Sequence, residues 1–131
     1  MLELYNLGIS EDEIKELIGQ CGDIVFMDND EVIEKIKLLE MIGCSNSQIR
    51  NIIICNPCYL IRFKEDLVGL FKKFIEIGID GLEMLFDSNP FLLNIDAFEI
   101  DNYIKNKIYS GTSKEDILDG FWNNPDIIDE I

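Results

Sequence analysis

The sequence contains no histidine, a single tryptophan and three prolines among 131 residues. Without histidine the chain lacks the commonest general base, the usual Ser-His and Cys-His nucleophile pairs, and most sets of zinc ligands. No apolar run approaches the roughly 18 residues that a membrane-spanning helix needs. The acidic start MLELYNLGISEDE also differs from a basic, then apolar signal peptide. We therefore expect a protein that is not an enzyme, does not enter a membrane and is cytoplasmic.

Positive charge is scarce, since 26 acidic residues face 11 basic ones and the formal net charge is −15. Residues 1–40 carry 11 acids and 3 bases (−8), residues 41–75 carry 2 acids and 5 bases (+3), and residues 76–131 carry 13 acids and 3 bases (−10). Such a field repels nucleic acid and acidic membranes over about a Debye length. The composition therefore favours a protein partner and disfavours nucleic acid everywhere except at the centre of the chain.

Glycines recur at nearly constant spacing, 35, 35 and 33 residues apart, at Gly8, Gly43, Gly78 and Gly111. Two residues after each glycine stands a favoured helix N-cap, whose side-chain oxygen accepts a hydrogen bond from the first helical turn: Ser10, Ser45, Asp80 and Ser113. A fixed distance of 21 residues separates Gly22, Pro57 and Pro90 from the next glycine. This regularity predicts an internal repeat with units 8–42, 43–77, 78–110 and 111–131 in a single domain, 1–131.

Each unit is expected to contain a short first helix, a bend and a longer second helix. The first helix stops before the proline, because the residue preceding proline is pushed out of the α region, and the proline then opens a short extra helix. In the second helix the apolar residues predict one buried face: Val32, Ile36 and Leu39, then Leu67, Phe71 and Phe74, then Ile100, Ile104 and Ile108. A single unit cannot bury its apolar stripe alone. The predicted fold is all-α, an α-solenoid or αα-superhelix of about three and a half repeats.

This order of glycine, cap, amphipathic helix, Asn-Pro and second helix resembles the repeat of the mitochondrial transcription termination factor (mTERF) family. The resemblance is carried by Gly43-Cys44-Ser45, Ile49, Ile52, Asn56-Pro57 and Leu60, with parallel sets in the other units. It covers essentially the whole chain. It implies a curved superhelix of helix pairs, each with a short third helix near the proline. It also implies the family's usual activity on nucleic acid, which its members hold along a basic concave face.

The basic residues of the centre are the candidate contacts for nucleic acid or another partner: Arg50, Arg62, Lys64, Lys72 and Lys73. Nucleic-acid binders use Lys and Arg to displace counterions from phosphates, and this chain offers such a group in one unit. The leading interpretation is a non-catalytic helical-repeat scaffold that binds a protein. The alternative is a transcription-related nucleic-acid-binding module that uses the basic central repeat.

The stretch Cys55-Asn56-Pro57-Cys58 is a C-x-x-C motif with three interpretations. A redox pair normally opens a helix, where the dipole lowers the thiol pKa, whereas Cys55 is expected at the end of one. A zinc site would add Cys21 and Cys44 to the motif. The favoured interpretation is four reduced structural thiols, with Cys44 in the core and with neither a metal nor another cofactor bound.

The two ends of the chain differ from a complete unit. The segment 4–7 matches the last turn of a second helix, and the last unit ends before its second helix begins. Phe121 and Trp122 lie on the uncovered first helix of that last unit, so they are either core residues, as such aromatics usually are, or an exposed end patch. Head-to-tail or dimeric self-association, which would cover Trp122, is a further hypothesis.

Overall fold

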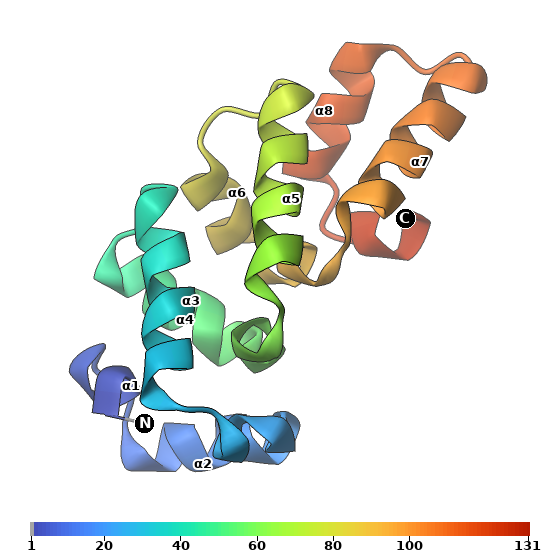
Figure 1. The fold of residues 1–131 in the computed structure, drawn as a ribbon. Helices are drawn as coiled ribbons and strands as arrows, with labels where there is room; N and C mark the ends of the chain where they lie inside the picture. Colours follow the sequence, from blue (N-terminus) through green and yellow to red (C-terminus); the bar gives the residue numbers. More distant parts are fainter. Residues whose placement is uncertain (1) are drawn as a thin grey trace.

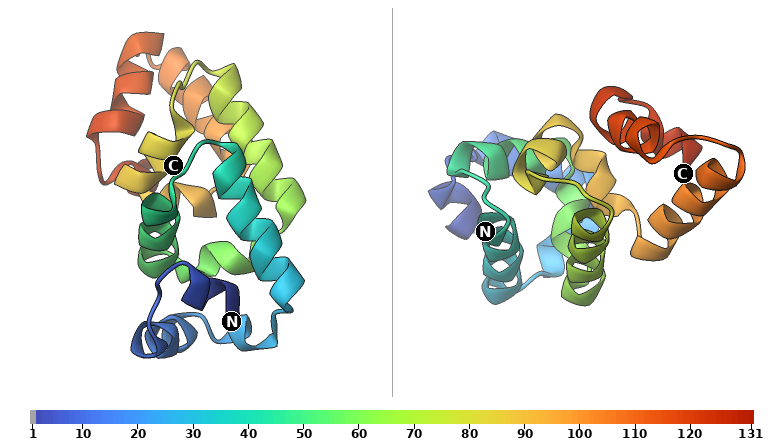
Figure 2. Two further views of the ribbon diagram at one scale, coloured as in Figure 1. Left: turned by 90° about the vertical axis from the view of Figure 1, so that its left-hand side faces the viewer. Right: turned by 90° about the horizontal axis from the view of Figure 1, so that it is seen from above.

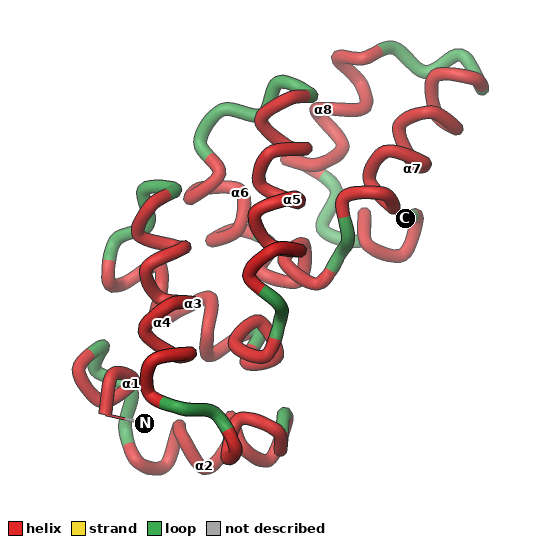
Figure 3. Tube along the Cα trace, in the orientation of Figure 1, coloured by secondary structure: helices red, strands yellow, loops and turns green. Residues whose placement is uncertain are grey.

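The structure, a computed structural model, describes residues 2–131, and within this range it consists of helices joined by short loops, without a strand (Figure 3). The α-helices are α1 (Leu2–Asn6), α2 (Glu11–Gln20), α3 (Asn29–Met41), α4 (Asn46–Cys55), α5 (Lys64–Glu76), α6 (Leu82–Ser88), α7 (Ala97–Tyr109) and α8 (Lys114–Asn123). The short 3₁₀ helices are η1 (Gly22–Phe26), η2 (Pro57–Ile61), η3 (Pro90–Asn94) and η4 (Ile127–Glu130). The predicted all-α class is confirmed.

One order of elements recurs along the chain: a shorter α-helix, a 3₁₀ helix and a longer α-helix. The longer helices α3, α5 and α7 each have 13 residues. They lie along one side of the molecule, with α4, α6 and α8 along the other, and the groups follow one another in chain order (Figures 1 and 2). None of the helices between residues 2 and 131 has the length and apolarity to cross a bilayer.

Polar caps fix where the shorter helices begin. Ser45 accepts the N–H of Gln48 at 3.2 Å, and the Gln48 side chain accepts the N–H of Ser45 at 2.9 Å. Ser10 forms the same reciprocal box with Glu13. Such a pair satisfies two of the free N–H groups at a helix start, so the sequence itself determines these helix boundaries.

The third unit begins differently, and the prediction that Asp80 caps its first helix is wrong. Helix α6 starts one residue later, behind Gly81, whose φ of 80° lies in the left-handed region that favours glycine. The third unit is two residues shorter than the first and second, and α6 has 7 residues where α2 and α4 have 10. A left-handed glycine therefore replaces the side-chain cap at this turn.

The buried apolar residues form one hydrophobic core that extends along the described helices, from Leu4 to Ile127. Aromatic rings carry it from the second unit to the last: Phe71 packs on Phe86, Phe86 on Phe74, Phe74 on Phe121, and Phe121 on Tyr103, with ring centroids 5.4 to 5.8 Å apart. Ile108, expected on the buried face of α7, is exposed, because this end of α7 diverges from α5 (Figure 1). The other predicted core positions of α3 and α5 are buried.

Candidate interaction surfaces

Arg50, on α4, joins the first two units. Its Nη2 donates hydrogen bonds to both carboxylate oxygens of Glu13 on α2, at 3.1 and 2.9 Å, and its Nε donates to the carbonyl of Gly8 at 3.4 Å. The hydrogen bond from the Ser10 backbone N–H, helped by the charge of Arg50, holds the pKa of Glu13 below its usual range. The Arg50 side chain is therefore bonded to Glu13 and Gly8 of the first unit.

Arg62 forms the equivalent link between the second and third units. Its Nη1 lies 3.0 Å from Oδ1 of Asp96, and its Nη2 donates to the carbonyl of Ile95 at 3.1 Å. The Nε of the same side chain is buried without a hydrogen-bond partner. The guanidinium is held at the start of α7, so its positive charge interacts with Asp96 and the carbonyl of Ile95 inside the molecule.

The three lysines of the predicted basic group divide into one that is paired and two that face solvent. Nζ of Lys73 lies 3.4 Å from Oδ1 of Asp101 on α7 and 3.6 Å from Oε2 of Glu76. Lys64 and Lys72, both on α5, are exposed and form no salt bridge with any residue that the structure describes. Of the five predicted contact residues, three thus link neighbouring units and two remain accessible.

Asn56 is a buried polar residue whose role sequence reasoning missed. Its Nδ2 donates to the carbonyl of Pro90 at 3.0 Å and to Oδ1 of Asn94 at 2.9 Å, both in the next unit. The Asn-Pro dipeptide predicted a bend in the chain. The recurrence of Asn before proline was the signal that the asparagine side chain also makes a structural contact. A buried amide with two acceptors in the next unit fixes the register between units.

Lys35, on α3, is buried as well and carries no charged partner within salt-bridge distance among the described residues. Its Nζ donates to the carbonyl of Leu60 at 3.2 Å, while the hydroxyl of Tyr59 donates to the carbonyl of Lys35 at 2.6 Å. Burial raises the pKa of Tyr59, so the phenol stays a neutral donor. These reciprocal bonds tie α3 to η2 of the next unit.

The four cysteines do not converge on one point. Cys55 is the exposed last residue of α4, Cys58 is half-buried in η2, and Cys21 and Cys44 are buried. The C-x-x-C motif thus spans the end of a helix, as expected from the sequence, and burial raises the pKa of Cys44 to about 12. Within residues 2–131 no three or more His, Cys, Asp or Glu side chains come together as metal ligands. The arrangement gives no support to a zinc site made from all four thiols.

The two aromatic residues of the candidate end patch differ in exposure. Phe121 is 2 % exposed, because α8 turns this face toward Phe74 on α5 and Tyr103 on α7. Trp122 follows it on the helix and, rotated by about 100°, is 39 % exposed. A single indole at this end therefore replaces the candidate two-residue patch.

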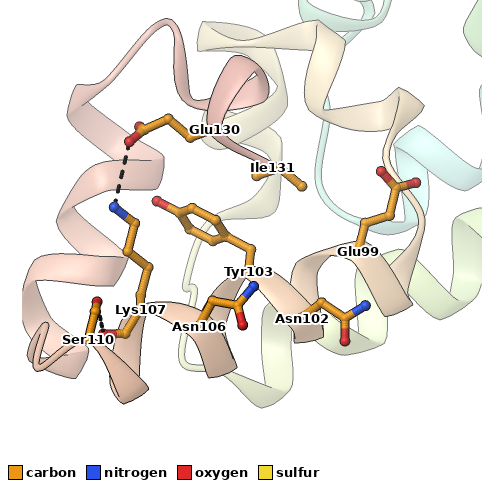
Figure 4. Close-up of a pocket in the computed structure, with 8 residues that line it drawn as sticks. All are labelled: Glu99, Asn102, Tyr103, Asn106, Lys107, Ser110, Glu130 and Ile131. Carbon is orange, nitrogen blue, oxygen red and sulfur yellow. Dashed lines mark hydrogen bonds and ion pairs between the residues drawn. The ribbon is translucent and has the colours of Figure 1, made fainter.

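An open cavity of about 630 Å³ lies between α7 and the C-terminal η4 (Figure 4). It is lined by Glu99, Asn102, Tyr103, Asn106, Lys107, Ser110, Glu130 and Ile131. Nζ of Lys107 lies 3.6 Å from Oε1 of Glu130 and 5.6 Å from the centroid of the Tyr103 ring. The Ser110 hydroxyl donates to the carbonyl of Lys107 at 2.9 Å. These polar groups are already paired, and the lining holds no nucleophile beside a base.

Three phenylalanines stand exposed where the longer helices begin. Phe26 ends η1, Phe63 precedes α5 and Phe98 is the second residue of α7, and they are 84 %, 73 % and 64 % exposed. Sequence reasoning missed them because it followed the buried faces. Their signal was a large apolar residue near each second-helix start, where a polar residue is usual.

Comparison of the chain with protein-family models, with curated proteins and with solved structures finds no match in any of the three.

Proposed function

We propose that the chain is an α-solenoid of about three and a half mTERF-like repeats, a non-catalytic scaffold that binds another protein. The observation that carries this proposal is the pairing of the central basic residues within the molecule. Arg50, Arg62 and Lys73 bind acidic residues of adjacent units. What remains accessible on an already acidic chain is mainly negative and apolar, which suits a protein partner better than a phosphate backbone.

The repeat architecture is supported by polar contacts that recur at a separation of about one unit. Gln48 contacts Met84, Asn51 contacts Asp87, and Asn56 contacts Pro90, at separations of 36, 36 and 34 residues. Arg50 reaches Glu13 across 37 residues and Arg62 reaches Asp96 across 34. Equivalent elements also pack on one another, α4 on α6 and α5 on α7. In stacked repeats each unit contacts its neighbours in this way.

Affinity capture from cell extract, with and without nuclease, tests the proposed function. The immobilised chain is expected to retain the same protein with and without nuclease, because the contact is between proteins. A charge-matched acidic protein of similar size serves as the control for adsorption of basic proteins. Loss of every captured protein after nuclease treatment, or capture no greater than by the control, would contradict the proposal.

The alternative function, nucleic-acid binding, rests on Lys64 and Lys72, which face solvent on α5. Two accessible lysines allow few phosphate contacts, so the salt dependence of binding would be shallow. A low-salt gel shift with single-stranded RNA and duplex DNA measures this directly. Binding that the double substitution Lys64→Ala and Lys72→Ala abolishes would favour the alternative, and absence of any shift would remove it.

The proposal also includes a cytoplasmic location. It further includes self-association of the chain, either head to tail or as a dimer. Trp122, accessible on α8, is the side chain that a second copy would cover. Both terminal regions are acidic, −8 for residues 1–40 and −10 for residues 76–131, so repulsion opposes the contact at low salt. Light scattering is expected to detect association at high salt, and a strict monomer at every salt concentration would exclude it.

A further inference from the structure

The exposed phenylalanines lie near the start of a longer helix in three successive units, Phe26 three residues before α3, Phe63 one residue before α5 and Phe98 in the first turn of α7. Exposed large side chains are ordinary when they are scattered, but a contiguous apolar strip indicates an interaction site. The N-terminal ends of α3, α5 and α7 follow one another along the same edge of the molecule (Figure 1). This edge, with Phe26, Phe63 and Phe98, is called the phenylalanine edge below.

Two open cavities lie beside the rings of the phenylalanine edge. The first, of about 400 Å³, is lined by both Phe26 and Phe63, and the second, of about 230 Å³, is lined by Phe98. Glu65, in the first turn of α5, lines both cavities, so the two lie on either side of this residue. The edge therefore presents apolar rings next to hollows that accept side chains of a partner.

The charge along the phenylalanine edge is negative. The acids that line the two cavities are Asp23, Glu31, Glu34, Glu65, Asp66 and Asp96. Of the three bases there, Lys35 is buried and Arg62 is paired with Asp96, which leaves Lys64 as the accessible cation beside the five other acids. Complementary charge steers association and selects partners, so this edge favours a positively charged occupant.

From these observations we propose that the phenylalanine edge binds a Lys- and Arg-rich protein segment that carries apolar side chains. The apolar side chains contact the three phenyl rings and enter the hollows, while the basic groups face the surrounding carboxylates. This inference rests on the proposed protein-binding function and adds the surface and the chemistry of the partner. Aromatic anchors surrounded by polar residues are typical of the residues that dominate binding energy at protein interfaces.

The test uses a fluorescein-labelled peptide in which Lys alternates with Leu, titrated with the full chain and followed by anisotropy. A first variant combines Phe26→Ser, Phe63→Ser and Phe98→Ser, which leaves the charge unchanged. A matched control combines Met41→Ser, Ile75→Ser and Tyr109→Ser, exposed residues at the opposite ends of the same three helices. The first variant is expected to bind the peptide at least about tenfold more weakly, and the control to bind like the parent chain.

Amide chemical-shift changes in the unsubstituted chain locate the peptide even if a variant folds poorly. We expect them at residues 22–35, 60–69 and 95–99. Shifts elsewhere, equal losses in both variants, equal binding of a Glu-Leu peptide, or tighter binding of single-stranded RNA at this edge would overturn the inference. If the peptide does not bind but affinity capture still retains a protein, the inference fails and the proposed function stands. If capture retains no protein, the proposed function itself fails.

Discussion

At the scale of single residues, the polar side chains buried in the described chain connect one unit to the next. Asn56 binds Pro90 and Asn94, and Lys35 binds the carbonyl of Leu60. The sequence predicted which apolar residues would be buried, because helical spacing marks a face. It did not predict these polar contacts, because partners about one unit away are known only once the helices are stacked. The sequence left the burial of Phe121 open for the same reason, since its covering rings come from α5 and α7.

Substituting Asn56 tests whether its buried amide stabilises the array. Asn56→Ala leaves the Pro90 carbonyl and the Asn94 side chain without their donor, and we expect the free energy of unfolding to fall by about 2 kcal/mol. Urea denaturation followed by circular dichroism measures it. The control is Asn51→Ala, which removes an exposed bond to Asp87 and should change stability by at most about 0.5 kcal/mol. Equal effects of the two substitutions would contradict the assigned role of Asn56.

The buried Cys44 thiol predicts how stability changes in alkaline solution. Burial, with Glu83 and Asp87 nearby, raises the pKa of Cys44 from 9.0 to about 12. The unfolded thiol ionises first, so above pH 9.0 the unfolded state binds fewer protons and the free energy of unfolding falls until about pH 12. Urea denaturation across this range should show the decline, and Cys44→Ala should lessen it. An unchanged slope in the variant would mean that this thiol is not buried as described.

At the scale of helices, side-chain caps determine where the shorter helices of most units begin. The start of α6 in the third unit is an exception. Ser10, Ser45 and Ser113 each accept a backbone N–H of the first turn, as their sequence positions predicted. Asp80 had the same position but not the same surroundings, because the shorter third unit must enter α6 through the left-handed Gly81. A sequence motif predicts a side-chain cap. It does not predict how a deletion of two residues shifts the turn that precedes the helix.

Two glycine substitutions with opposite expected signs test this difference. Gly81→Ala forces a left-handed conformation on a residue with a side chain and should lower the free energy of unfolding by about 1 kcal/mol. Gly69→Ala, inside α5 with open space around the added methyl group, should raise it by about 0.5–1 kcal/mol. Thermal and urea denaturation of both variants provide the measurement. A stabilising Gly81→Ala would show that the turn before α6 has a different backbone conformation.

At the scale of the whole molecule, the net charge could be predicted from the sequence, but the pairing of the charged side chains could not. The net charge of −15 and its uneven distribution follow from composition alone. The basic centre, however, suggested a binding face, and the structure instead places Arg50, Arg62 and Lys73 against acids of neighbouring units. Counting charges cannot reveal this, because pairing depends on which helices meet.

Salt should stabilise the folded chain. Like charges crowd together on folding, and most of the ion pairs involve partly or largely exposed side chains that contribute little. Added NaCl screens the repulsion, so the midpoint of thermal unfolding should rise with salt concentration. Differential scanning calorimetry in increasing NaCl is the measurement. A falling midpoint would show that the ion pairs between units outweigh the repulsion.

The central claim is that the helical units are stacked in chain order, so that the first unit does not touch the last. Solution NMR of the isotopically labelled chain tests it most directly through distance-dependent proton contacts between side chains. The account predicts such contacts between Phe71 and Phe86, Phe74 and Phe121, and Tyr103 and Phe121, and between elements of adjacent units. Contacts joining side chains of the first unit, 8–42, to those of the last, 111–131, within one monomer would contradict it.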